Sequence, residues 1–519
     1  MAILLTVASL ALGAAPSSAT QRYIVDFAPM LIADPASLPA DVRGLLGRHA
    51  TRLANGSARL GHAGVHELMG VMQKTCNNFT EHRRYTALAE GFVAELSSGQ
   101  RAQLKRLSLS PTPDLLLSLN LPRLEEESVR EQAAGPHSLE KLAMPEWFPL
   151  SEWMPNGDKS SSEETTAKRA AGLWGPSVPW ALDRINQVDL PLDGDGGWSA
   201  DGRNVHVFVV DTGLNAKHAE FAGRVGSGYD FIDNDSDPND CDGHGTHCAG
   251  SCCGKTYGVA PAVTIHAVRV LNCEGSGYSS DIMAGLEWVA NQDTGGMRKV
   301  VSMSISGPRD SMENRMVKSL VEQDIVVVVA AGNNAGDACQ HSPASSADAI
   351  TVGASASNDI VATFSNFGKC VDIVGPGQAI ESAYVGGTNT VKKLSGTSMA
   401  TPHVAGVVAL MLQVDPTKGA VAVKKELLAD AIRGKLTLSA EGNDAPNLLV
   451  HLGQSLRNFN NTGDVRYRAP PPRPTPPSSP SPFSAFLLWL QNWKWPAVLS
   501  FNFASAPAPS PAPSPFPSL

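Results

Sequence analysis

Short apolar runs alternate with amphipathic stretches through the middle of the chain. Runs rich in β-branched residues occupy positions 205–210, 264–271, 299–305 and 325–331. Between them, residues 280–291 and 310–323 repeat apolar positions with helical spacing. This alternation is typical of βαβ units, which build a parallel sheet covered by helices. Functional residues of such a sheet are expected at the carboxyl ends of its strands.

The apolar run 404–412 predicts a further helix that is buried all round. Residues 394–404, which lead into it, spell L-S-G-T-S-M-A-T-P-H-V. Gly396 permits a tight turn, and Pro402 is tolerated because it lies near the start of the helix. Ser398 is therefore expected at a helix N-terminus, where the positive end of the helix dipole favours developing negative charge.

A serine hydroxyl such as that of Ser398 needs a base and an orienting acid to act as a nucleophile. Two upstream motifs supply candidates. V-V-D-T-G ends a predicted strand with Asp211, and D-G-H-G-T-H begins a helix of small residues with His244. The order Asp, His, Ser along the chain is that of subtilisin. We interpret the three as a catalytic triad; the alternative, a zinc site at His244 and His247, lacks the glutamate of H-E-x-x-H.

Two further motifs extend this interpretation: A-A-G-N at 330–333 and G-T-S-M-A-T-P-H-V-A-G at 396–406. With them the chain resembles the subtilisin-like serine proteases, in particular the proteinase K and aqualysin branch, over roughly residues 180–452. The resemblance implies an α/β fold, a subtilisin-like three-layer domain with a mostly parallel central sheet, preceded by a small α+β propeptide domain. It also implies that Ser398 attacks the peptide carbonyl, His244 is the general base, and Asp211 holds the imidazole's tautomer.

The resemblance assigns an oxyanion hole and a substrate cleft as well. Asn333 would donate its side-chain amide to the oxyanion, beside the backbone N–H of Ser398. An extended peptide substrate would pair with the cleft as an added strand. The cleft residues so implied are Gly275, Ser276, Gly277, Ser304, Ile305, Ser306, Gly307, Ala330 and Gly332. Ser306 stands where the family has glycine and narrows the pocket rim, and the uncharged pocket favours hydrophobic or aromatic residues before the cut.

Structural calcium is implied by the resemblance at two places, in keeping with the preference of calcium for several oxygen ligands. The first combines the carboxylate of Asp372 with the backbone carbonyls of Ala347 and Ala349. The second comprises Asp183, Asn186, Gln187, Asp193 and Asp195. A third acidic loop is equally open to a metal site and to a solvated turn; its members are Asp233, Asp235, Asp237, Asp240 and Asp242.

The eight cysteines indicate an oxidising compartment. The family's pairing implies disulfides between Cys241 and Cys273 and between Cys339 and Cys370. Cys248 resembles the free, buried thiol of proteinase K. Cys252 and Cys253 are either free or paired elsewhere, because adjacent cysteines rarely bridge each other. The remaining cysteine, Cys76, lies in the expected propeptide.

The length of 519 residues predicts more than one domain. We expect a signal peptide (1–19), an inhibitor-like propeptide (20–131), a linker (132–172), the peptidase domain (173–455) and a Pro-rich tail (456–519). The maturation cut is expected between residues 166 and 175. Within the propeptide, residues 110–122 look like an insertion. The alternatives are a truncated start for the signal peptide and an unrelated small α+β domain for the propeptide.

A formal charge of −9 argues against a nucleic-acid partner. The aromatic stretch 483–503 contains polar residues and proline, so we expect no transmembrane segment. The sequence therefore predicts a secreted, monomeric serine endopeptidase, made as a self-processing zymogen, that hydrolyses protein or peptide substrates through an acyl-enzyme and is inhibited by its own propeptide. The alternative is a non-catalytic extracellular protein that reuses the fold and binds a cell wall or partner through its Pro-rich tail.

Overall fold

The computed structural model covers the whole chain. It describes residues 21–27, 38, 40–52, 58–75, 80–85, 91–107, 109, 111–119, 121, 178–438, 444–457 and 459. The expected signal peptide, the linker with its maturation cut at 166–175, and the Pro-rich tail beyond residue 459 lie outside the described residues.

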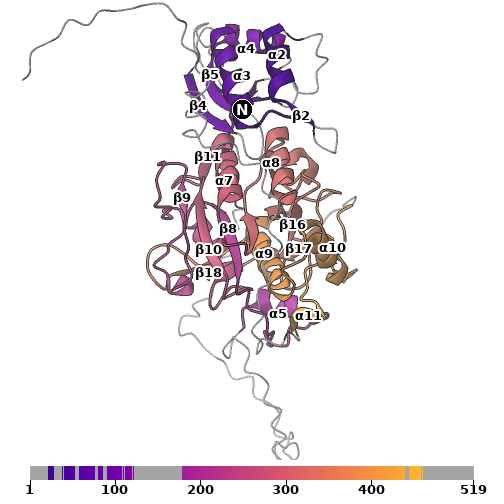
Figure 1. The fold of residues 1–519 in the computed structure, drawn as a ribbon. Coiled ribbons are helices and arrows are strands. Elements are labelled where there is room, and N and C mark those ends of the chain that lie inside the picture. The colour runs from indigo at the N-terminus through magenta and orange to yellow at the C-terminus, as the bar shows by residue number, and fades with distance from the viewer. Residues whose placement is uncertain are drawn as a thin grey trace, which may run out of the picture. The chain divides into compact units, whose positions relative to one another are not determined.

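A nine-stranded sheet forms the centre of the larger domain, in the order β20-β21-β17-β16-β14-β12-β8-β10-β9. Figure 1 labels β8, β9, β10, β16 and β17 of this sheet. Its strands are β8 Val205–Asp211, β9 Tyr229–Asp230, β10 Thr264–Arg269, β12 Arg298–Met303, β14 Val326–Ala330, β16 Ile350–Ser355, β17 Ile373–Pro376, β20 Ile432–Arg433 and β21 Leu448–Leu449. All neighbouring pairs are parallel except β20 with β21. The predicted mostly parallel α/β sheet is confirmed.

Helices cover the sheet in two main groups, α6 with α9 and α7 with α8. The described helices of this domain are α5 Trp180–Asn186, α6 His244–Cys253, α7 Ser279–Asn291, α8 Ser311–Val321, α9 Thr397–Val414, α10 Ala420–Asp430 and α11 Gln454–Arg457, with 3₁₀ turns η2 Ala219–Phe221 and η3 Ala338–Gln340. Strand β8 contacts both groups, and all seven of its residues are buried. Burial on both faces explains its mostly apolar sequence.

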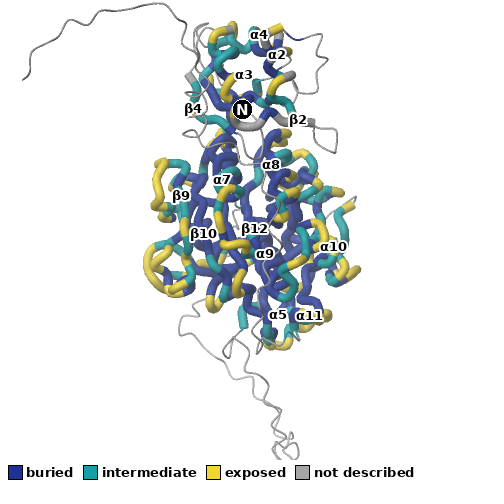
Figure 2. Tube along the Cα trace, in the orientation of Figure 1, coloured by how far each residue is buried: buried dark blue, intermediate teal, exposed yellow. Residues whose placement is uncertain are grey.

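Helix α9 lies at the centre of the hydrophobic core and contacts β8, β12, β14, β16 and β17. Figure 2 shows α9 and the central strands buried along their length. By length and composition α9 is apolar enough to cross a membrane, but 94% of it is buried inside the fold. It is the only such helix among the described residues. Its hydrophobicity is therefore explained by the core of this domain.

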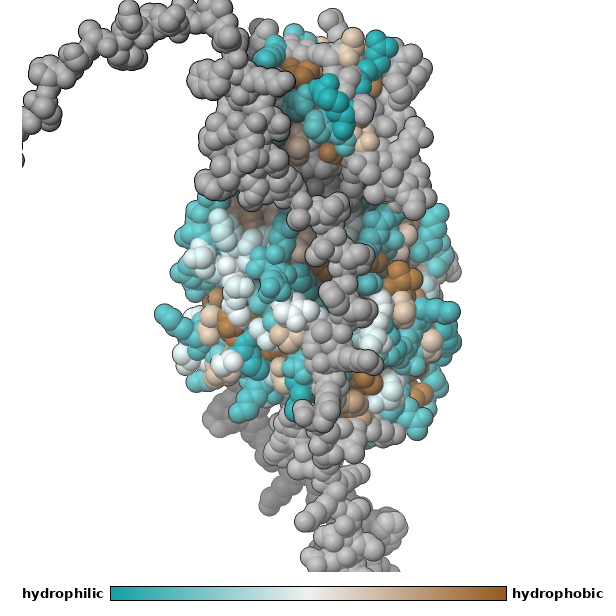
Figure 3. Space-filling model, in the orientation of Figure 1, coloured by the Kyte–Doolittle hydropathy of each residue, from teal (hydrophilic) through white to brown (hydrophobic). Residues whose placement is uncertain are grey.

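Three short strand pairs border the main sheet. They are β11 Ser276–Tyr278 with β7 Leu116–Ser118, β13 Gly307–Pro308 with β15 His341–Ser342, and β18 Ile380–Ala383 with β19 Val391–Leu394. On the face shown in Figure 3, hydrophilic side chains are interspersed with hydrophobic ones. Cys241 is bonded to Cys273 and Cys339 to Cys370, whereas Cys248, Cys252 and Cys253 are buried and free.

The N-terminal part folds as a separate small α+β unit around its own core, with Val25, Phe27, Leu68 and Phe92 among its buried members. Its four-stranded sheet has the order β4-β5-β1-β6. The elements are β1 Gln21–Asp26, α2 Ala40–His49, β2 Thr51–Arg52, β3 Ala58–Arg59, α3 Gly61–Thr75, β4 Thr80–Tyr85, β5 Gly91–Leu96, α4 Ser98–Arg106 and β6 Thr112–Pro113. Ser97 and Gln100 form a capping box that starts α4.

Candidate active site

Asp211 and His244 meet where a central strand ends and a helix begins. Asp211 is the last residue of β8, and His244 is the first residue of α6. The Nδ1 atom of His244 lies 2.7 Å from Oδ1 of Asp211, and both side chains are buried. Gly243 makes this helix start possible, because it has φ 111° and a Cβ there would lie 2.4 Å from the ring of Tyr384.

The carboxylate of Asp211 sets the charge state of His244. Burial disfavours the charged imidazole, but the nearby Asp211 overcomes this, and the pKa of His244 is raised well above its ordinary value of 6.5. Cys248 also approaches the ring, with Sγ 3.9 Å from Nδ1. Burial raises the pKa of the Cys248 thiol, so the thiol stays neutral.

His247 has a separate place in the structure. Its Nε2 lies 3.0 Å from the carbonyl oxygen of Ile380 and 3.1 Å from that of Lys392, both in the β18–β19 hairpin. Burial lowers the pKa of His247 to about 3, so the ring is neutral. These contacts support the structural interpretation of His247 over a zinc pair with His244.

Ser398 is the second residue of α9 and is 4% exposed. Its Oγ donates a hydrogen bond to the carbonyl oxygen of Ser304, 3.1 Å away. Its own carbonyl oxygen accepts from Cys248 Sγ at 3.4 Å, so the thiol links the nucleophile to the His244 ring. Nε2 of His244 has no hydrogen-bond partner among the described residues. Cys248 thus contacts both the His244 ring and the Ser398 backbone, and the Ser398 hydroxyl is turned toward Ser304.

Asn333 follows β14 in a turn that approaches the start of α9. Its Oδ1 accepts hydrogen bonds from both the backbone N–H and the hydroxyl of Thr397, each at 2.9 Å. A Cβ at Gly396 would lie 3.4 Å from Nδ2 of Asn333, so the amide nitrogen is directed toward the nucleophile's turn. This orientation suits a donor to an oxyanion beside Ser398.

A small cavity of about 20 Å³ lies next to Ser398. Its lining comprises Ser118, Leu119, Ser304, Ser306, Ala330, Gly332, Asn333, Asn334, Thr397 and Ser398. Four of the predicted substrate-binding residues therefore share one pocket with the nucleophile. Leu119, from the N-terminal part of the chain, helps to close that pocket.

Comparisons with known proteins agree with this geometry. Residues 202–457 match the peptidase model of the Subtilase family. The chain is 46% identical over 283 residues to the extracellular serine proteinase of Thermus sp. (strain Rt41A), a match that covers 54% of this chain and 68% of that protein. The chain belongs to the subtilase family.

Two further matches each cover about half of the subtilase. Alkaline serine exoprotease A of Vibrio alginolyticus is 48% identical over 259 residues, which is 50% of this chain and 48% of that protein. A solved structure, that of a cold adapted subtilisin-like serine proteinase, is 42% identical and superimposes with a TM-score of 0.51 over 54% of this chain and 99% of that one. The subtilisin-like fold of the larger domain is therefore established.

The predicted substrate-binding edge of the subtilase is paired with a strand of its own N-terminal part. Strand β7 runs antiparallel to β11, with Ser118 opposite Ser276 and Leu117 opposite Gly277. The backbone N–H of Leu119 continues the pairing by donating to the carbonyl oxygen of Gly275 at 2.9 Å. The sequence interpretation of residues 110–122 as an insertion missed this role, although the alternating leucines 115, 117, 119 and 121 are a strand-like signal.

Leu117 reaches another predicted cleft residue of the subtilase, Gly307. A Cβ on Gly307 would lie 2.6 Å from Cδ2 of Leu117, so a side chain at this position would force the leucine to shift. Ile305, the remaining predicted cleft residue, is buried at 3% exposure in the main core. The other eight line the cavity at Ser398 or contact the strand from Leu116 to Leu119.

The N-terminal part also caps a helix of the peptidase domain. Oδ1 of Asp114 accepts from the backbone N–H of Ser280 at 3.0 Å, and its Oδ2 accepts from the Ser280 hydroxyl at 2.7 Å. Helix α7 receives no side-chain cap from its own N-cap residue, Tyr278. Asp114 of the N-terminal part therefore caps the N-terminus of α7, which belongs to the peptidase domain.

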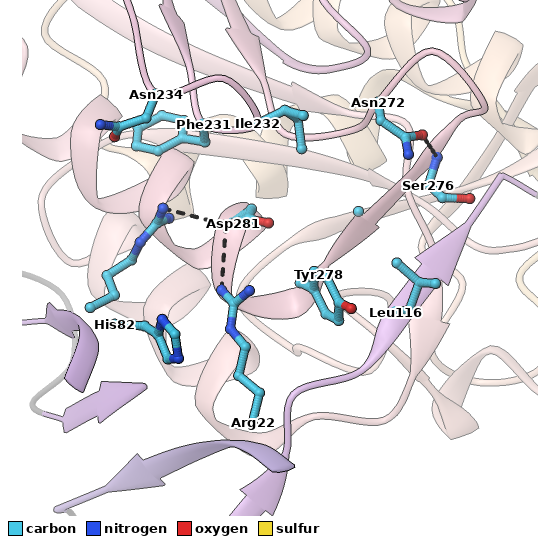
Figure 4. A pocket seen from close by; sticks show the side chains of 12 residues that line it. Arg22, His82, Leu116, Phe231, Ile232, Asn234, Asn272, Ser276, Tyr278 and Asp281 are labelled. Atoms are coloured by element: carbon cyan, nitrogen blue, oxygen red, sulfur yellow. Dashed lines mark hydrogen bonds and ion pairs between the residues drawn. The ribbon is translucent and has the colours of Figure 1, made fainter. Parts of the chain in front are cut away.

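Charged pairs surround this cap beside a cavity of about 490 Å³ (Figure 4). Arg22 and Arg83 both point toward Asp281 of α7, at 3.8 Å and 3.3 Å. Arg22 also lies 2.8 Å from Asp114. A further pair joins Asp26 of β1 to Arg315 of α8. The N-terminal part thus contacts both α7 and α8 of the peptidase domain.

The first predicted calcium site of the subtilase holds an ammonium group. Nζ of Lys424 donates to the carbonyl oxygens of Ala347 at 3.1 Å and Ala349 at 2.5 Å, and to Oδ2 of Asp372 at 2.8 Å. These are the three ligands predicted for the metal. A calcium ion does not fit the residues as they stand, because a fixed positive charge already lies among its ligands.

The second predicted calcium site differs from the first, because it contains buried oxygen atoms that have no hydrogen-bond partner among the described residues. Asp183 Oδ1 and Asn186 Oδ1 are both buried without a hydrogen-bond partner. Burial raises the pKa of Asp183, and the carboxylate of Asp193 adds to that rise. Gln187 Oε1 accepts from the N–H of Asp193, and Asp195 Oδ1 accepts from that of Gly197. Two orphaned buried oxygens among acidic side chains suit a divalent cation.

The third acidic loop is held together by the protein itself. Asp240 accepts hydrogen bonds from the hydroxyl of Thr212 and from the backbone N–H groups of Gly243 and Thr246. Asp233 forms an ion pair with Arg269 at 2.8 Å. Of the two interpretations left open by the sequence, these contacts favour a structural turn that positions His244.

Proposed function

We propose that this subtilase is a secreted serine endopeptidase that cleaves peptide bonds through Asp211, His244 and Ser398. The observation that carries the proposal is the buried contact of His244 with Asp211 beside a serine at the N-terminus of α9. An oriented asparagine amide supports it, because acyl transfer needs a donor where negative charge develops.

Each residue would do a defined part of the reaction. The Ser398 hydroxyl turns from Ser304 to Nε2 of His244, gives it a proton and attacks the substrate carbonyl. Asp211 stabilises the imidazolium. Nδ2 of Asn333 and the N–H of Ser398 hold the oxyanion. The imidazolium then protonates the leaving amine, and water hydrolyses the acyl-enzyme by the same route in reverse.

The enzyme would be made as a zymogen with the N-terminal domain as its inhibitor. Support comes from β7, which pairs with the substrate-binding edge, and from Leu119, which lines the pocket of Ser398. A substrate cannot pair with β11 while β7 does. The Asp114 cap on α7 and the arginine pairs with Asp281 would hold the inhibitor in place.

Secretion and calcium binding complete the proposal. The two disulfides and the relative named an extracellular proteinase favour an oxidising, extracellular location. Calcium would be held by Asp183, Asn186 and the acidic residues of the following loop. It would stabilise the fold near the start of the peptidase domain and take no part in the reaction.

Peptide hydrolysis by the secreted chain tests the proposal. Wild type should cleave an unstructured protein substrate, and Ser398→Ala should lower kcat by roughly 10⁵ or more. Ser357→Ala, at an exposed turn, is the matched control and should behave as wild type. Equal activity of the Ser398→Ala and Ser357→Ala variants would remove the proposal in favour of a non-catalytic protein with this fold.

A further inference from the structure

The clearest departure from expectation is the side chain of Lys424 at the Asp372 site. We propose that its ammonium group is a built-in cation that replaces calcium there, so that the metal dependence of this subtilase is confined to the Asp183 site. The inference is independent of whether the protein is a protease.

The surrounding oxygens satisfy all the hydrogen-bond donors of the ammonium group. Nζ has three protons, and three oxygens lie within 3.1 Å of it. The donor and its three acceptors come from elements far apart in sequence: Lys424 belongs to α10, Ala347 and Ala349 precede β16, and Asp372 precedes β17. Asp372 Oδ2 also accepts from the backbone N–H of Thr351 at 2.9 Å, which fixes the carboxylate.

The same geometry excludes a metal. Calcium takes six to eight oxygen ligands at about 2.3–2.6 Å, and a second cation would be repelled by the ammonium group at that range. The Lys424 side chain is 20% exposed, so solvent screens this charge only in part. Because the cation is covalently attached to α10, a chelator cannot remove it.

The melting temperature tests the proposal in the full chain carrying Ser398→Ala, which prevents self-digestion. Lys424→Met should lower Tm by roughly 5 °C, since a largely buried carboxylate loses its partner. Lys425→Met, at the exposed neighbouring position of α10, should change it by less than about 1 °C. Asp372→Asn should lower Tm equally with calcium and with a chelator, and Asp183→Asn should remove whatever calcium response wild type has.

Two results would overturn the proposal. One is that Asp372→Asn abolishes the effect of calcium on Tm, or that it reduces the number of calcium ions bound per chain by one. The other is a Lys424→Met chain as stable as Lys425→Met. A wild-type chain that ignores calcium altogether agrees with the proposal at this site, provided that Lys424→Met lowers Tm.

Discussion

Thr397, the residue before the nucleophile, donates both its backbone N–H and its hydroxyl to Oδ1 of Asn333, each over 2.9 Å. The two bonds leave the amide only one orientation, with Nδ2 turned away from Thr397. The start of α9 thus positions the proposed oxyanion donor as well as Ser398.

Replacing Asn333 with alanine should therefore lower kcat by about 10²–10³, the effect of losing the asparagine donor in subtilisin. KM should change little, because the bond forms with the oxyanion and not with the ground-state carbonyl. Steady-state kinetics on a peptide substrate measure both values. Asn389→Ala, in an exposed turn, is the control. A large rise in KM with kcat unchanged would assign Asn333 to substrate binding.

The pH profile should reflect the Asp211–His244 pair. Catalysis needs the neutral imidazole, and the pKa of His244 is raised above 6.5, so kcat/KM should fall as the pH drops through a value above 6.5. Asp211→Asn removes the anion that favours the imidazolium and should move this acid limb to lower pH while reducing kcat by about 10⁴. A wild-type limb below 6.5 would contradict this account of the pair.

The cap from Asp114 to α7 should contribute to inhibition. A helix N-cap contributes about 1 kcal/mol, so residues 20–121 carrying Asp114→Ala should inhibit the mature enzyme about fivefold more weakly than the unaltered domain. Glu67→Ala, at the exposed pair with Arg48 away from the interface, should inhibit normally. Inhibition constants equal for all three would mean that the cap adds no affinity.

The ion pair of Arg184 with Asp359 should dominate the stability of the region around α5. Arg184 is fully buried, and its guanidinium bonds both carboxylate oxygens of Asp359, at 2.6 Å and 2.9 Å. Arg184→Met leaves Asp359 without its partner and should destabilise the fold by about 3–5 kcal/mol. Urea unfolding of the Ser398→Ala background measures this. Arg203→Met, at a half-exposed pair with Asp201, should cost about 1 kcal/mol or less.

Local pattern predicted much of the peptidase fold. The β-branched run 205–210 is β8, which extends one residue further to Asp211, and the expected helix 280–291 is α7, which begins at Ser279. Buried strands of a parallel sheet consist of consecutive apolar residues, so a sequence reveals them directly. The motifs that contain Asp211, His244 and Ser398 lie at the ends of such elements, so the sequence alone predicts that these residues lie at a strand end and at two helix starts.

Contacts between segments that are distant in the sequence cannot be predicted from local pattern. Lys424 is 52 residues from Asp372, and nothing in the helical pattern of α10 indicates that its side chain meets the predicted calcium ligands. The sequence predicts an insertion where the structure has the strand Leu116–Ser118, because its partner, β11, lies in another domain. Pairing across domains depends on tertiary packing, which short-range periodicity does not contain.

The central claim is that Ser398 is the nucleophile activated by His244. A fluorophosphonate reacts covalently with such a serine, and mass spectrometry of the digested protein identifies the modified residue. In the mature wild-type enzyme we expect a single modified serine, Ser398, and in the His244→Ala variant the rate of modification should fall by at least 10³. Modification at another serine, or equal rates in both proteins, would contradict the account.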